Sequence, residues 1–125
     1  DSGPVVAGLM HFKQYKQVNT ANFVLKVHIP DNCIRFGKDK IGIIRNIFFD
    51  GKNISLLLQK FKKTSYVFSE PMLSCDIGIY LLTDLDDSME ICKLDNIYDK
   101  MVMFPAKSSD ISKTWIGIPL LHSAS

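Results

Sequence analysis

The 125-residue sequence contains few cysteines, and their spacing excludes several kinds of site. Cys33, Cys75 and Cys92 lie far apart, with no Cys-x-x-Cys pair and no histidine at ligand spacing. Zinc sites usually show such clustering, so the sequence predicts no metal site. An odd number of cysteines also argues against a disulfide framework, which favours a reducing, intracellular compartment.

Long apolar runs and a strong excess of one charge are also missing. No run approaches the roughly 20 apolar residues that cross a bilayer, so we expect no membrane partner. The formal net charge is +2, well below the basic excess of most nucleic-acid-binding domains. The hydrophobic content of 46% is too high for a disordered tail, and the length suits one domain with its own core.

No catalytic motif is present. The sequence has no glycine-rich phosphate loop and no Gly-x-Ser-x-Gly elbow. His28 falls on the polar side of an expected strand, where a surface histidine is the commoner interpretation. A dyad of Cys33 with His28 has no third group to orient it, and a thiol nucleophile at Cys33 or Cys75 is the remaining enzymatic hypothesis. We therefore expect a non-enzymatic protein with no catalytic residue, no metal and no cofactor.

Alternation of apolar and polar residues is the dominant pattern. Residues 23–29 alternate and predict a half-buried strand with Phe23, Leu25, Val27 and Ile29 on its apolar side. Two apolar runs, 41–49 and 54–61, flank Asp50-Gly51, which predicts a hairpin whose second strand is central. Further strands are expected at 6–15, 76–82, 89–93, 100–104 and 115–121, and one helical turn at 94–98. Pro119 predicts that the last strand lies at a sheet edge or bends.

Short strands separated by Gly, Pro, Asp and Asn define the expected fold class. Spacings of about 8–15 residues predict an all-β fold, namely a small antiparallel β-barrel or sandwich with short helical turns. We expect residues 1–125 to form a single β-rich interaction domain with an ordered core of about 5–122.

Charges are divided between two segments. Lys60, Lys62 and Lys63, with Lys38, Lys40 and Lys52, make the middle of the chain basic, and Asp84, Asp86, Asp87 and Glu90 make the next connection acidic. Solvated loops explain this pattern most simply. The functional alternative is a bipolar surface, on which the acidic loop attracts a basic peptide and the basic strand contacts phosphates.

Aromatic residues give a second candidate surface. Tyr66 and Phe68 are two residues apart and share a face if their segment is extended. Tyr80 and Trp115 lie on other predicted strands. Such rings form a cage for a methylated ammonium if they converge, although core packing is the commoner fate of aromatic residues in a small domain.

Four segments resemble the bromo-adjacent homology (BAH) family. Residues 41–48, Ile-Gly-Ile-Ile-Arg-Asn-Ile-Phe, resemble its first strand motif, and an aromatic stretch follows at 66–71. Residues 79–86, Ile-Tyr-Leu-Leu-Thr-Asp-Leu-Asp, and 97–103, Ile-Tyr-Asp-Lys-Met-Val-Met, resemble two later motifs. The resemblance covers about half of the chain. Residues 115–122 are also similar to the Trp-x-x-Ile-Pro-Leu-Leu-His ends of transposon-derived proteins.

The resemblance implies a β-barrel interaction module of a nuclear, chromatin-associated or gene-silencing protein, with a histone, a nucleosome or a silencing factor as partner. The chain departs from the family where Gln-Lys-Phe-Lys-Lys at 59–63 replaces an aromatic stretch and where Gly78 replaces an acidic residue. These departures affect a ligand site more than the fold.

The leading hypothesis is therefore a protein-interaction module that binds a protein or peptide through a barrel surface. Its candidate partner-binding residues are Tyr66, Phe68, Tyr80, Asp84, Asp86, Asp87 and Glu90. One alternative is a nucleic-acid-binding β domain with phosphate contacts from Lys60, Lys62 and Lys63. Another is a self-association domain that forms a homodimer through an apolar edge strand.

Overall fold

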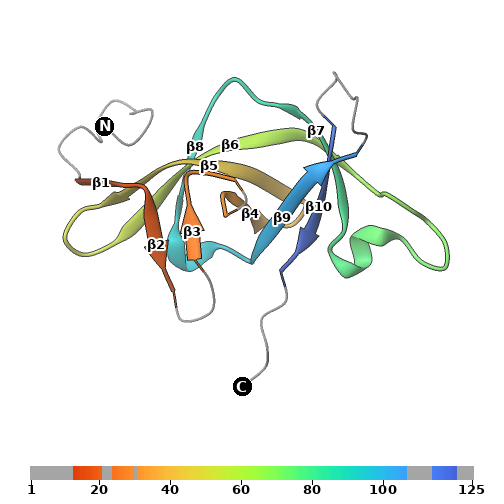
Figure 1. Ribbon diagram of the computed structural model, residues 1–125, viewed down its shortest axis with the longest axis horizontal. Coiled ribbons are helices and arrows are strands. Elements are labelled where there is room, and N and C mark those ends of the chain that lie inside the picture. The colour runs from red at the N-terminus through yellow and green to blue at the C-terminus, as the bar shows by residue number, and fades with distance from the viewer. Residues whose placement is uncertain (1–12, 21–23, 30, 107–113, 121–125) are drawn as a thin grey trace.

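A computed structural model describes residues 13–20, 24–29, 31–106 and 114–120. It contains ten strands and two short 3-10 turns, and the described part of the chain has no α-helix (Figure 1). The strands are β1 (Lys13–Tyr15), β2 (Gln17–Asn19), β3 (Val24–Lys26), β4 (Cys33–Gly37), β5 (Lys40–Phe49), β6 (Ile54–Ser65), β7 (Tyr80–Leu85), β8 (Glu90–Lys93), β9 (Asp99–Pro105) and β10 (Trp115–Pro119). The 3-10 turns are η1 (Ser74–Ile77) and η2 (Leu94–Asn96). The predicted all-β class is confirmed.

Six strands close into an antiparallel barrel rather than a sandwich. They pair in the order β5-β4-β9-β10-β7-β6, and β6 pairs back with β5. Closure gives every barrel strand two hydrogen-bonded neighbours, so its backbone groups are satisfied without an open edge. β1 extends the sheet beside β5, β8 extends it beside β6, and β2 with β3 forms a separate two-stranded sheet.

The β5–β6 hairpin is the longest element and matches its prediction. Gly51 adopts the positive φ of 93° that the Asp50-Gly51 turn requires. The Asp50 carboxylate accepts hydrogen bonds from the backbone N–H groups of Lys52 (2.8 Å) and Asn53 (2.6 Å), which lower its pKa. As predicted, β6 is central: it pairs with β5, and also with β8 near the turn and with β7 farther along.

A β-bulge at Arg45 interrupts β5, which contributes to a barrel core, an outer core and the smaller buried pair of Phe48 with Leu57. The register with β6 shifts between Ile44 and Asn46, so Arg45 is an extra residue in the strand. All six barrel strands contribute to the barrel core or its border: Cys33, Ile41, Ile43, Phe61, Tyr80, Leu82, Met101 and Met103, with Trp115 at its edge. The outer core consists of Leu25, Ile34, Phe36, Ile44, Ile47, Leu56 and Leu58.

Lys100 fastens the outer layer to the barrel. It lies on β9 and is only 5% exposed, although it is charged. Its ammonium donates a hydrogen bond to the backbone carbonyl of Val24 (2.7 Å) and forms an ion pair with Asp31. A buried ammonium is stable only when it is paired in this way. These contacts hold β3 and the following turn, and with them Leu25, against the barrel.

Several predicted strands end elsewhere in the structure. The strand expected at 23–29 is reduced to β3, and Ile29, expected on its apolar side, is 65% exposed because the chain turns after Lys26. The strand expected at 76–82 begins only at Tyr80, because η1 and Gly78, with φ of 85°, precede it. Of the strand expected at 6–15, only 13–15 lies within the described residues, as β1; Phe23 lies outside them, as do parts of the expected 5–122 core.

Of the two alternatives that Pro119 predicted for the last strand, an edge or a bend, the edge is wrong. β10 lies between β9 and β7, so it is an interior strand of the barrel. Pro119 is tolerated there because it is the final residue of the strand, where the ladder ends. The helical turn expected at 94–98 is confirmed as η2, and the strands expected at 89–93 and 100–104 are confirmed as β8 and β9.

Replacing Lys100 with Met should destabilise the protein by about 2 kcal/mol, because the carbonyl of Val24 loses its donor and Asp31 keeps only Lys26 (3.8 Å) as a partner. Lys52→Met is the matched control, since Lys52 lies in the exposed β5–β6 turn, and it should change stability by less than about 0.5 kcal/mol. Urea denaturation measures both. Equal stability of the two variants would show that the Lys100 contacts do not hold the outer layer in place.

Candidate functional site

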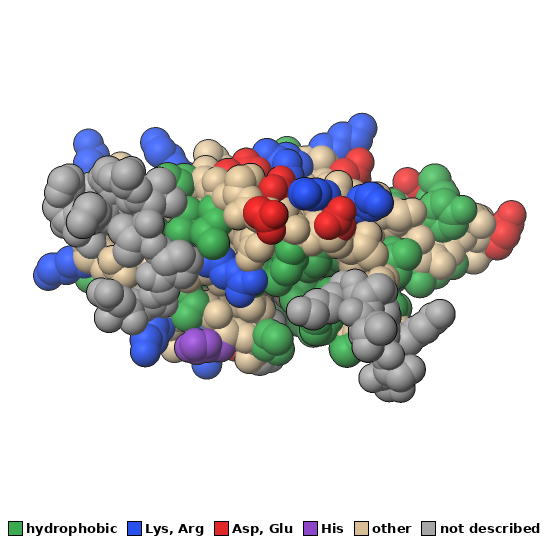
Figure 2. Space-filling view, turned by 90° about the horizontal axis from the view of Figure 1, so that it is seen from above, with side chains coloured by type: hydrophobic (Ala, Val, Ile, Leu, Met, Phe, Trp, Pro, Cys, Tyr) green, Lys and Arg blue, Asp and Glu red, His purple; other side chains and the backbone are tan. Residues whose placement is uncertain are grey.

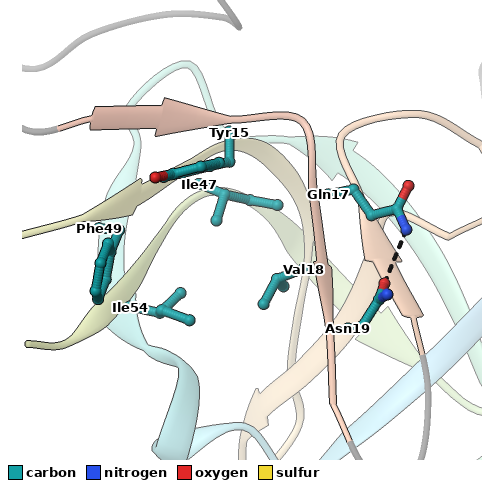
Figure 3. Close-up of a pocket in the computed structure, with 7 residues that line it drawn as sticks. All are labelled: Tyr15, Gln17, Val18, Asn19, Ile47, Phe49 and Ile54. Atoms are coloured by element: carbon teal, nitrogen blue, oxygen red, sulfur yellow. Dashed lines mark hydrogen bonds between the residues drawn. The ribbon is translucent and has the colours of Figure 1, made fainter. Parts of the chain in front are cut away.

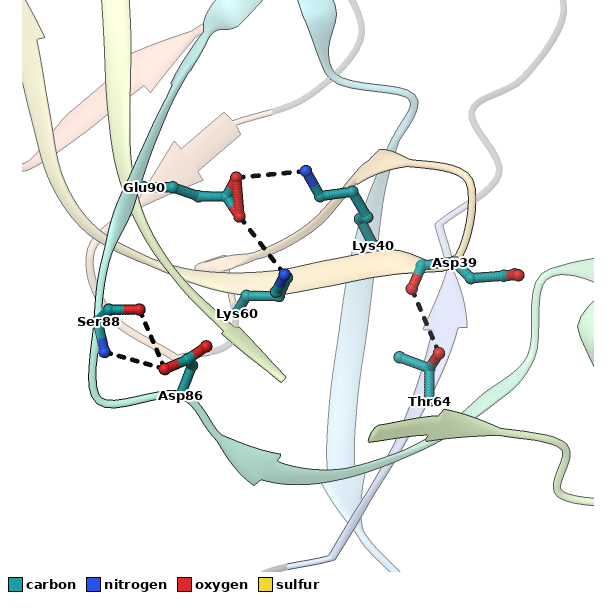
Figure 4. Close-up of polar contacts among 7 residues, drawn as sticks. All are labelled: Asp39, Lys40, Lys60, Thr64, Asp86, Ser88 and Glu90. Atoms are coloured by element: carbon teal, nitrogen blue, oxygen red, sulfur yellow. Dashed lines mark hydrogen bonds and ion pairs between the residues drawn. The ribbon is translucent and has the colours of Figure 1, made fainter. Parts of the chain in front are cut away.

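The predicted basic strand and acidic connection meet in space. The carboxylate of Glu90 contacts the ammonium of Lys40 at 3.2 Å and that of Lys60 at 3.8 Å (Figure 4). Acidic and basic side chains adjoin over the middle of the face in Figure 2. Glu90 therefore lies among the lysines and not on a separate acidic surface, because β6 and β8 are hydrogen-bonded neighbours that bring these opposite charges together.

The four candidate acidic residues have different surroundings. Asp86 closes its own turn: its carboxylate accepts hydrogen bonds from the backbone N–H and hydroxyl of Ser88 (3.1 and 3.0 Å), which lower the pKa of Asp86. Glu90 pairs with lysines, Asp87 is exposed, and Asp84 borders a cavity described below. These side chains do not act as one acidic patch.

The three candidate phosphate-binding lysines are also separated by their surroundings. Lys60 is half-buried and pairs with Glu90, whereas Lys62 and Lys63 are exposed. Successive residues of a strand point to opposite faces, so Lys62 and Lys63 do not share a surface. Within the described residues, β6 therefore presents no continuous basic stripe.

Tyr80 is not available to a partner, in contrast to its prediction as a binding residue. It is 3% exposed and packs in the barrel core, and its hydroxyl donates a hydrogen bond to Asp39 (2.6 Å). Burial and this bond raise the pKa of Tyr80 to about 12. Tyr66 and Phe68 are 51% and 36% exposed on the β6–β7 loop, so Tyr80 cannot join them in an aromatic cage.

The β6–β7 loop, residues 66–79, is the most apolar exposed segment of the described chain. It projects from one end of the molecule (Figure 1). Its exposed apolar residues are Tyr66, Val67, Phe68, Met72, Leu73 and Ile77. Single exposed apolar residues are ordinary, but a contiguous group of them marks an interaction surface.

Ser74 fixes the shape of this loop from inside. It is fully buried, and its hydroxyl accepts hydrogen bonds from the backbone N–H groups of Val67 (2.7 Å) and Phe68 (3.4 Å). Its own N–H donates to the carbonyl of Phe68, and its carbonyl accepts from Ile79, at 2.9 and 3.0 Å. The loop is therefore a folded unit that presents its apolar side chains in a defined arrangement. The sequence carried no signal for this role of Ser74.

Among the cavities lined by described residues, two exceed 300 Å³ and lie away from this loop. The first, of about 380 Å³, lies between β1, β2 and the tip of the β5–β6 hairpin, and Tyr15, Val18, Ile47, Phe49 and Ile54 give it apolar walls (Figure 3). Gln17 and Asn19 at its side hydrogen-bond to each other (2.8 Å). The second, of about 410 Å³, is the mouth cavity, lined by Ile29, Asn32, Ile43, Arg45, Asp84, Leu85, Met103 and Trp115.

The thiols do not have the surroundings of nucleophiles. Cys33 is fully buried, and burial raises its pKa to about 12, so it is protonated at neutral pH. Burial also raises the pKa of Cys75. His28 is exposed, as predicted. No cluster of three metal-ligating side chains occurs among the described residues. No described helix has the length and apolar character needed to cross a membrane.

Together, these features define a small closed β-barrel with a projecting apolar loop and a mixed polar cavity. The chain belongs to the family "Domain of unknown function (DUF8592)", whose model matches residues 1–120. No curated protein and no solved structure matches the chain.

Raising the pH above 9 should lower the stability of the folded protein, because the thiol of Cys33 ionises more readily in the unfolded chain. The unfolded thiol ionises near pH 9.0 and the folded one only near 12, so stability is full below pH 9 and falls between these values. The expected slope is about 1.4 kcal/mol per pH unit for this one proton. Urea denaturation of the unmodified protein and of Cys33→Ala, from pH 8 to 11, isolates this contribution, because the two proteins share all other titratable groups. Parallel curves would contradict it.

Replacing Ser74 with Ala should loosen the β6–β7 loop without loosening the barrel, because two backbone N–H groups lose their acceptor. Hydrogen exchange measured by mass spectrometry should become at least about tenfold faster in peptides covering 66–79 and stay unchanged in β5 and β9. Ser69→Ala, in an exposed position of the same loop, is the control. Unchanged exchange in the loop would show that Ser74 does not fix its shape.

Proposed function

We propose that this domain is a non-enzymatic protein-interaction module that binds its partner through the β6–β7 loop. The observation that carries the proposal is the group of six exposed apolar side chains on a loop whose shape is fixed by Ser74. Burying such side chains against a partner is the main source of binding free energy, and a preordered loop loses less entropy on binding. Tyr66 and Phe68, candidate residues from the sequence, belong to this group.

The charge of the loop favours a basic partner. Residues 64–79 include Glu70 and Asp76 but no lysine or arginine. A segment that carries both apolar and basic side chains therefore complements the loop. Histone tails have this chemistry, and the resemblance to the BAH family implies the same class of partner. We propose accordingly that the domain acts in the nucleus, in a chromatin-associated or gene-silencing protein of transposon origin.

The two alternatives have less support. Nucleic-acid binding would rely mainly on Lys62 and Lys63, because Lys60 is half-buried and already forms an ion pair with Glu90. Self-association through an edge strand would involve β1 or β8 of the large sheet, or β2 or β3 of the small one, since β10 lies inside the barrel. The apolar loop itself is a surface that a second copy of the chain would also cover, so light scattering belongs in any binding test.

Ile77→Ser should weaken binding to a basic histone-tail peptide at least about tenfold, because Ile77 is 50% exposed and belongs to the group of apolar side chains on the loop. Ile91→Ser is a matched control, since Ile91 is 48% exposed on β8, away from the loop. A titration with a panel of histone-tail peptides and nucleosomes, followed by NMR, measures affinity and location together. Backbone shifts should concentrate at 66–77.

The outcomes are distinct. Equal loss in both variants, or no binding of any peptide or nucleosome, would contradict the proposal. Shifts that centre on Lys62 and Lys63 and disappear at high salt would instead favour nucleic-acid binding. A dimer in light scattering that Ile77→Ser dissociates would favour self-association.

A further inference from the structure

The mouth cavity has the size and walls of a small-molecule site. Its volume of about 410 Å³ lies within the range of ligand pockets in proteins, roughly 300–1,000 Å³. Ile43 and Met103 of the barrel core, with Leu85 and Trp115 at the border of that core, form an apolar wall. The cavity therefore opens the barrel core to solvent at one end.

Asn32 adds a polar residue to the lining of the cavity. It is only 5% exposed, and its backbone carbonyl is fixed by a hydrogen bond from the N–H of Ile44 (2.7 Å). Its side-chain amide lines the cavity and has no hydrogen-bond partner within the described residues. The amide atoms are open to the cavity, because the described residues contain no buried side-chain polar atom that lacks a hydrogen-bond partner. The amide can therefore hydrogen-bond to a molecule in the cavity.

Arg45 enters the cavity from the β-bulge. Bulges redirect side chains and are frequent beside binding sites. The Nε–H of Arg45 donates to the side chain of Gln59 (2.8 Å), and the amide nitrogen of Gln59 donates to the carbonyl of Asp86 (2.8 Å). This chain of bonds orients the guanidinium through one nitrogen. The two terminal nitrogens form no ion pair within the described residues. Each can donate a hydrogen bond to one oxygen of the same carboxylate.

Asp84 supplies the opposite charge. It adopts a positive φ of 65° at the end of β7, a conformation that few non-glycine residues hold. Its carboxylate is exposed and forms no hydrogen bond or ion pair within the described part of the chain. Arg45 and Asp84 line the same cavity without pairing with each other, which leaves each charge available to a ligand.

We propose that the mouth cavity binds a small zwitterion with an apolar body, the chemistry of a free apolar α-amino acid. Arg45 binds its carboxylate, Asp84 binds its ammonium, and Asn32 hydrogen-bonds to the polar end. The wall of Ile43, Leu85, Met103 and Trp115 takes its side chain. This site is independent of the β6–β7 loop and adds a second binding activity to the proposed function.

Isothermal titration of the whole chain with L-phenylalanine, L-leucine and L-methionine tests the proposal. We expect saturable binding of at least one of them. For that amino acid, the analogue without the ammonium and the analogue without the carboxylate, such as 3-phenylpropionate and phenethylamine for phenylalanine, should bind at least about tenfold more weakly. Failure of all three amino acids to bind, or equal binding of either analogue, would overturn the proposal.

Two pairs of variants locate the site. Arg45→Gln and Asp84→Asn should each weaken binding at least about tenfold, whereas Lys62→Gln and Asp87→Asn, at exposed positions, should leave it unchanged. Circular dichroism checks the fold of each variant. If Arg45→Gln fails to fold, the exposed Asp84→Asn decides. Equal affinity of Asp84→Asn and Asp87→Asn would overturn the proposal. Ile77→Ser should leave amino-acid binding unchanged, so failure of this site and failure of the loop proposal are distinguishable.

Discussion

The hydrogen-bonded pairing of β5 with β6 determines where nearly every other strand lies. The two strands have 10 and 12 residues, longer than a barrel this small requires. One half of the hairpin closes the barrel with β4 and β7, and the other half carries β1 and β8. The pairing is close at Gly42, where an added Cβ would come within 2.8 Å of the carbonyl oxygen of Gln59. The bulge at Arg45 then shifts the alternation, so that Ile47 joins Ile44 in the outer core, whereas Ile41 and Ile43 lie in the barrel core.

The sequence predicted what depends on neighbouring residues. The dipeptide Asp50-Gly51 alone was enough to predict its turn. Apolar residues on both faces of 54–61 predicted a central strand. Long-range consequences could not be predicted. Alternation assigns Tyr80 to a face but does not say whether that face points into the barrel. The pairing of Glu90 with Lys40 and Lys60 depends on which strands become neighbours, and a register shift at Arg45 has no local signature. Pro119 suggested an edge strand, because the sequence does not show that the strand ends at this residue and has neighbours on both sides.

The two candidate binding surfaces lie at opposite ends of one strand. β7 begins at Tyr80, directly after the apolar loop, and Asp84 of the mouth cavity lies near its other end. At about 3.3 Å per residue, roughly 13 Å of strand separate Tyr80 from Asp84. Tyr80 is held rigidly, because it packs in the barrel core and bonds to Asp39. The strand therefore connects a surface suited to a macromolecule with a cavity suited to a small molecule, while both rest on the same core.

The internal bonding of the β6–β7 loop has an evolutionary consequence. Ser74 holds the loop to itself, and apart from Cys75, which packs against the barrel core, its exposed side chains contribute little to folding. Substitutions in the loop and substitutions in the barrel are then subject to separate selection. Members of the family can therefore change the loop, and with it the partner that they bind, while they keep the same barrel. We expect sequence change among them to be fastest at 66–73 and slowest along β5 and β6.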